Sequence, residues 1–238
     1  MAHAAAPRGA VERLANSLFD RVPDDPLAEE LAGWLAGSGR FRAFAEAHHD
    51  KIRKKLRHAA DAEARRDVRA ELRVAHLLLA DRRIELAFEA YGSRNAGPDF
   101  TVASRGERTF NLEVTRLRGS PRVADLGRPL LAKLRQLPPS TPNALLVAIE
   151  GDSAQALDVA AATRALRARA DRKDEAFFQG RGFDGTRSFY DRYLRLAAVL
   201  VWCDGAAGDA RAALWSNRSA RIPLPERAAQ ACLACLTR

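Results

Sequence analysis

Four segments of strand length between residues 84 and 150 limit the folds that are open to this chain. IELAFEA (84–90) alternates apolar and polar residues, which is typical of a half-buried strand. DFTVAS (99–104) and RTFNLEVTRL (108–117) follow as two more strands on either side of a short turn. A helix is expected over 125–137, and ALLVAIE (144–150) is a continuous apolar run that suits a strand buried on both faces.

Helices are expected on both sides of these strands. Residues 11–19 and 27–35 predict short helices, and the run 40–91, without Gly or Pro, predicts one long helix or two end-to-end helices ending near Asp81. After the fourth strand we expect a helix at 154–176, strands at 196–203 and 210–216, and a closing helix at 225–236. The expected fold is α/β, a mixed sheet flanked by helices, with a helical N-terminal extension (1–60) and an α/β core (61–238).

Charge and composition narrow the classes of partner. The formal net charge of +9 favours a polyanionic partner such as nucleic acid, although an arginine-rich, solvated surface is the alternative interpretation. Three cysteines exclude a disulfide scaffold, and Cys232 and Cys235 are interpreted as packing residues on a helix. With no apolar run near 18 residues and no signal-peptide layout, we expect a cytoplasmic protein without a membrane partner.

The turn between the second and third strands decides which residues share a face of the sheet. A three-residue loop at 105–107, with Gly106 at positive φ, pairs Ser104 with Arg108 and places Asp99 opposite Glu113. Directly opposed side chains point to the same face, with Cβ atoms about 5 Å apart. A two-residue loop would instead put the two carboxylates on opposite faces.

Two neighbouring carboxylates on a strand favour a cation between them. Mg²⁺ or Mn²⁺ is the expected cofactor, because these ions prefer carboxylate oxygens and use only one or two of them. The alternative is structural: Asp99 caps its strand, and Glu113 forms a buried ion pair with Arg116 or Arg118.

GPDFTV followed by FNLEVT, after a helix with Glu71 and before a helix with Lys133 and Gln136, resembles the PD-(D/E)XK nuclease superfamily. The resemblance covers residues 63–151. It implies a restriction-endonuclease-like core in the order helix, three-strand meander, helix, strand. It also implies that Asp99 and Glu113 bind the metal and that Glu71 assists them. Glu63 is the weaker candidate for that assisting position.

The chain departs from the family at Thr115, where the motif has a catalytic lysine. A threonine hydroxyl can hydrogen-bond a water but brings no positive charge. Three interpretations stay open. Lys133, together with Gln136, supplies the missing group from the following helix; the site works more slowly with metal and water alone; or cleavage is lost and binding is retained.

The resemblance implies a metal-dependent nuclease that acts on DNA, with RNA as the less favoured substrate. The alternative is a catalytically inactive nuclease-fold protein that binds nucleic acid or a protein partner, and a third option is a small ligand such as a nucleotide. Double-strand cutting by one site per chain would require a homodimer. The candidate nucleic-acid contacts lie in two loops and at the end of the third strand: Ser93, Arg94, Asn95, Arg116 and Arg181.

Overall fold

The computed structural model describes residues 8–19, 25–91, 97–118, 126–150, 158–205 and 210–237, and divides the chain into two compact units, 1–82 and 83–238. Within these ranges the protein is a mixed α/β protein with a six-stranded sheet. The helix at 62–78 groups by its contacts with the N-terminal helices. The division at residue 60 predicted from the sequence stays a prediction.

The first unit consists of helices, three of which begin at side-chain caps. Asp25 accepts a hydrogen bond from the Leu27 amide (3.0 Å), and Ser38 and Asp61 cap the next segments in the same way. The predicted run to Asp81 is therefore broken twice, since α3 ends before His48 and the cap at Asp61 starts a new helix. The helices are α1 (Arg8–Leu18), α2 (Pro26–Gly37), α3 (Gly39–Ala47), α4 (His49–His58) and α5 (Ala62–Leu78).

An aromatic cluster forms part of the core of this unit. The His76 ring stacks on Trp34 at 5.5 Å between centroids and meets Phe41 edge-on at 5.3 Å. Burial, and then the nearby positive charge of Arg73, lowers the pKa of His76 to about 4. The imidazole is therefore neutral at physiological pH and acts as a packing group.

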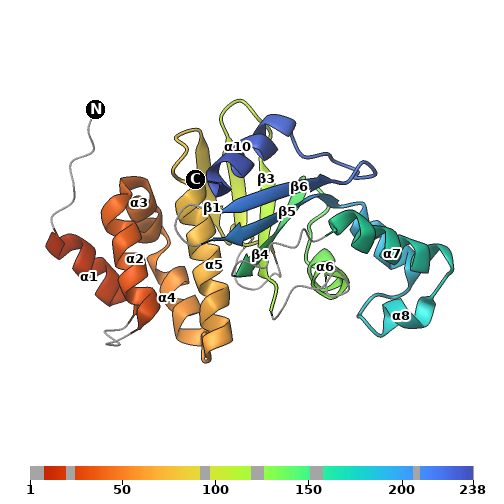
Figure 1. Ribbon diagram of the computed structural model, residues 1–238, viewed down its shortest axis with the longest axis horizontal. Coiled ribbons are helices and arrows are strands. Elements are labelled where there is room, and N and C mark those ends of the chain that lie inside the picture. Colours follow the sequence, from red (N-terminus) through yellow and green to blue (C-terminus); the bar gives the residue numbers. More distant parts are fainter. Residues whose placement is uncertain are drawn as a thin grey trace. The chain divides into compact units, whose positions relative to one another are not determined.

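The second unit is built on the sheet, with the strands in sequential order (Figure 1). β1, β2 and β3 form an antiparallel meander, β3, β4 and β5 run parallel, and β6 returns antiparallel to β5. The strands are β1 (Ile84–Phe88), β2 (Phe100–Ser104), β3 (Phe110–Arg116), β4 (Asn143–Glu150), β5 (Leu196–Asp204) and β6 (Arg211–Ser216).

Helices cover both faces of this sheet. One face carries Leu145, Val147 and Val199, which share a buried cluster with residues of four helices: α6 (Gly127–Leu134), α7 (Val159–Asp171), α8 (Glu175–Gln179) and α9 (Thr186–Tyr193). On the other face the Trp202 indole donates a hydrogen bond to the Leu236 carbonyl (3.0 Å) of α10 (Glu226–Leu236). Cys232 and Cys235 are buried free thiols on α10.

The helix expected at 154–176 is shorter than predicted and is followed by a second one. Lys173 takes a positive φ of 56°, which ends α7, and Asp174 caps α8 by accepting from the Phe177 amide (3.2 Å). The glycine-containing segment 177–185 therefore begins inside a helix, and its Phe178 and Phe183 are buried. No helix among the described residues is both long and apolar enough to cross a membrane.

Candidate functional site

The register of the β2–β3 hairpin agrees with the prediction. Phe100 pairs with Leu112, Thr101 with Asn111 and Val102 with Phe110, so the same register places Asp99 opposite Glu113. The turn differs in detail, because the ladder ends at Val102 and Phe110. Ser104, expected to pair with Arg108, lies beyond this ladder; its carbonyl accepts the Glu107 amide (2.9 Å), and on the other edge of β2 it pairs with Ile84 of β1. Gly106 has the expected positive φ, 82°.

Backbone amides of the hairpin hold the carboxylates of Glu113 and Asp99. The backbone amide of Asp99 donates to Glu113 Oε2 (3.2 Å), and the amide of Val114 donates to Asp99 Oδ2 (2.8 Å). Only 3% of the Glu113 side chain is exposed, whereas Asp99 is half-buried. The two carboxylates thus lie next to each other, one inside the protein and one toward its surface.

Lys133 extends from α6 to this pair. Its ammonium group donates a hydrogen bond to Glu113 Oε1 and forms an ion pair with it. Leu131 and Leu134, on either side of Lys133 in α6, are buried in the core. The packing of these two leucines turns Lys133 toward the sheet, and a quarter (25%) of its side chain is exposed. Glu113 therefore pairs with Lys133, not with Arg116 or Arg118 as the structural alternative supposed.

Electrostatics at Glu113 favour an additional positive charge. Burial raises the pKa of Glu113 from 4.5 to about 7; the negative charge of Asp99 is the second cause, and Lys133 opposes both. A close ion pair normally holds a carboxyl pKa down, so Lys133 compensates for only part of the burial and repulsion. A cation placed between the two carboxylates would remove the rest.

A buried amide network, which the sequence analysis missed, holds the strand ends beside this pair. The Asn111 side chain donates to Asn143 Oδ1 (3.0 Å) and to the Tyr91 hydroxyl (3.1 Å), and accepts from the Thr101 hydroxyl (3.2 Å). A Cβ at Gly97 would lie 2.7 Å from the Tyr91 Cβ, so this position requires glycine. The signal in the sequence was a polar Asn111 two residues before Glu113 on a buried strand.

The structure also describes the four remaining residues that were predicted to belong to the metal site or to catalysis. Glu71 forms an ion pair with Lys55, and Glu63 with Arg66, both within the first unit. Thr115 lies half-buried on the same face of β3 as Glu113, and the half-buried Gln136 lies just beyond the end of α6. Their predicted roles stay predictions.

The structure describes two of the five predicted nucleic-acid contacts. Arg116 is buried on the opposite face of β3 from Glu113, and Arg181 is exposed after α8. The remaining three, Ser93, Arg94 and Asn95, lie outside the described residues. Contact with nucleic acid stays a prediction for all five.

The donor set of the site fits a hard divalent cation. Within the described ranges, no three His, Cys, Asp or Glu side chains gather in a way that could hold a metal. Mg²⁺ requires fewer ligands from the protein, since it keeps several waters and binds through one or two carboxylates. Asp99 and Glu113 supply that number, and burial together with the negative charge of Asp99 raises the pKa of Glu113.

None of the family models, curated proteins or solved structures compared with the chain matches it. The resemblance to PD-(D/E)XK nucleases therefore depends on the motif residues and on the order of the elements. That order is observed: α5, the meander β1–β2–β3, α6 and then β4.

Proposed function

We propose that this protein is a metal-dependent nuclease of the PD-(D/E)XK type, with a restriction-endonuclease-like core, that hydrolyses phosphodiester bonds in DNA. The observation that carries the proposal is the contact between Lys133 and Glu113 beside Asp99. Two carboxylates and one ammonium group, brought from the residue before β2, from β3 and from α6, are the groups that the motif requires. The positive charge comes from α6 because β3 has Thr115 at the position of the motif lysine.

Asp99 and Glu113 would hold Mg²⁺ or Mn²⁺ through carboxylate oxygens. When bound, such an ion supplies positive charge to a phosphate oxygen and lowers the pKa of a coordinated water. The backbone amides of Asp99 and Val114 fix the orientation of both carboxylates, so little reorganisation accompanies binding.

Lys133 and Thr115 would act on the substrate side of the site. The Lys133 ammonium, which donates to Glu113 Oε1, would also stabilise the negative charge that develops on a phosphate oxygen. The Thr115 hydroxyl shares the Glu113 face of β3 and can hydrogen-bond a water. The net charge of +9 supports binding to the nucleic-acid backbone.

A cleavage assay with matched variants tests the proposal. Purified protein with Mg²⁺ or Mn²⁺ is incubated with supercoiled plasmid, linear duplex, single-stranded DNA and RNA. The wild-type protein should cut at least one DNA substrate. Asp99→Asn should reduce cutting to the level of a reaction without protein. Asp184→Asn, which removes the same charge from an exposed position, should cut like the wild type. Equal cutting by Asp99→Asn and Asp184→Asn would refute the assignment.

The ion pair between Lys133 and Glu113 also favours a second candidate, a nuclease-fold protein that binds nucleic acid without cutting it. In that protein the ammonium takes the place of the metal and stays in the ion pair. Titration with Mn²⁺ separates the two candidates, because the nuclease binds the ion through Asp99 whereas the inactive protein does not. Salt-dependent DNA binding without Mn²⁺ binding or cleavage would establish the inactive protein.

A further inference from the structure

A cavity of about 640 Å³ lies between α6, α7 and the segment after α8. The described residues that line it include three arginines and no acidic residue: Arg128, Arg169 and Arg181. The rest of the lining is glycine, alanine, leucine and phenylalanine. A volume of this size falls in the range of small-ligand sites, about 300–1,000 Å³.

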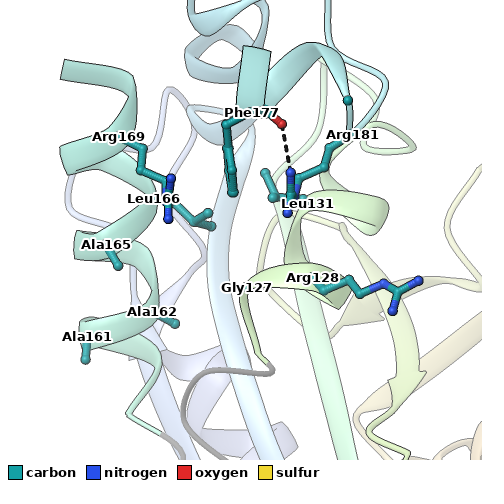
Figure 2. Close-up of a pocket in the computed structure, with 11 residues that line it drawn as sticks. Gly127, Arg128, Leu131, Ala161, Ala162, Ala165, Leu166, Arg169, Phe177 and Arg181 are labelled. Carbon is teal, nitrogen blue, oxygen red and sulfur yellow. Dashed lines mark hydrogen bonds between the residues drawn. The ribbon is translucent and has the colours of Figure 1, made fainter. Parts of the chain in front are cut away.

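Phe177 holds two of these arginines in place (Figure 2). Its ring lies between the guanidinium groups of Arg169 and Arg181, at 4.3 Å and 3.7 Å from their central carbons. Arg181 also donates a hydrogen bond to the Phe177 carbonyl (3.0 Å), and Arg169 pairs with Asp174 at 2.9 Å. Stacking on an aromatic ring limits the rotamers of both side chains, so a ligand would meet donors that are already positioned.

The third arginine lies at the beginning of α6. Within the described part of the chain, Arg128 makes no recorded ion pair or hydrogen bond and is exposed to solvent. No side chain among the described residues caps this helix, and its first residue, Gly127, lines the cavity. A helix N-terminus beside a guanidinium group favours a negatively charged ligand.

The chemistry of the lining defines the ligand. Guanidinium groups donate and never accept, so the polar part of the ligand must be an acceptor-rich anion, and phosphate matches their planar geometry. The apolar wall formed by Leu131, Leu166 and Ala165 suits a flat or apolar group joined to that anion. A nucleotide has both parts.

We propose that this cavity binds a nucleotide through its phosphate, with Arg128 and Arg181 on the phosphate and the base against the apolar wall. The nucleotide is either free or one unit of a nucleic-acid strand. The described residues of the lining offer no side-chain acceptor to read the donor groups of a base, so binding is insensitive to base identity. The site does not depend on Asp99 or Glu113 and does not require cleavage.

Calorimetric titration of the full chain in EDTA, without divalent metal, tests the cavity separately from the nuclease proposal. Adenosine 5′-monophosphate should bind the wild-type protein, and adenosine should bind at least about tenfold more weakly, because a charged hydrogen bond is lost. Arg128→Ala and Arg181→Ala should each weaken binding of the monophosphate about tenfold. Arg164→Ala removes the same charge from an exposed position on α7 outside the cavity and should bind normally.

A second variant tests the apolar wall. Ala165→Phe introduces a ring at an exposed position of the lining and should exclude the nucleotide while the protein stays folded by circular dichroism. Asp99→Asn should bind the monophosphate like the wild type, whatever its effect on cleavage. If a ten-nucleotide oligothymidylate displaces the monophosphate, the site takes a unit of a strand; if it does not, the site takes the free nucleotide.

Three results would overturn the proposal. One is equal affinity for adenosine and its monophosphate, and another is an equal loss of affinity in Arg164→Ala and Arg181→Ala. The third is binding to phosphatidylglycerol vesicles without binding of the monophosphate, which would mark an anionic-lipid surface instead.

Discussion

Replacing Glu113 by glutamine should stabilise the metal-free protein at neutral and alkaline pH. In the folded protein, burial and the charge of Asp99 raise the pKa of Glu113 from 4.5 to about 7. Between these two values the folded state holds a proton that the unfolded state has released, so the free energy of unfolding falls as the pH rises. The difference corresponds to about 3 kcal/mol when the pH is above 7.

Glutamine is neutral at every pH and keeps the shape and one of the two acceptor oxygens, so it should remove most of that cost. We expect Glu113→Gln to equal the wild type near pH 4 and to exceed its free energy of unfolding by up to about 3 kcal/mol at pH 8. If the ion pair between Glu113 and Lys133 instead stabilises the fold, Glu113→Gln should be less stable than the wild type at pH 8. Leaving Lys133 without its partner at a partly buried position would destabilise the variant at pH 8.

Urea unfolding in EDTA at several pH values measures this difference. Trp34 belongs to the first unit, so a Trp34→Phe background leaves only Trp202 and Trp215, both in strands of the second unit, as fluorescent reporters. Glu226→Gln, at an exposed position of α10, is the matched control. A Glu113→Gln protein that is less stable than the wild type at pH 8 would refute the electrostatic reasoning. Saturating Mn²⁺ should then stabilise the wild type and leave Glu113→Gln unchanged.

Three further predictions concern packing and pH. Gly97→Ala should destabilise the second unit by about 1–3 kcal/mol, because its Cβ would lie 2.7 Å from that of Tyr91. Gly33→Ala, with open space around the new methyl group in α2, should stabilise the first unit by about 0.5–1 kcal/mol, and urea midpoints measure both. The lowered pKa of His76 predicts that the first unit loses stability as the pH falls from 6.5 to about 4. His76→Phe should abolish this acid sensitivity in Trp34 fluorescence, and an unchanged acid transition would contradict it.

The sequence determined the strands and the hairpin register. Alternation in IELAFEA, the apolar run at 144–150 and the turn around Gly106 are local signals, and a strand has only two faces to choose between. All six predicted strands were found within a few residues of their expected ends, and Asp99 faces Glu113 as expected. Helix breaks were harder to predict, because the changes at His48 and Lys173 follow from caps and single backbone angles.

Only the tertiary structure decided where the long side chains point. Lys133 lies among leucines on α6, and the sequence allowed it to face either solvent or the sheet until the packing of Leu131 and Leu134 fixed the helix rotation. The pairing of Asn111 with Asn143 joins strands that are 32 residues apart, which no local pattern encodes. The pKa of Glu113 also depends on burial and on neighbours brought from three elements. Local interactions therefore specify the elements and their register, whereas the electrostatics of the site arise only when the helix packs on the sheet.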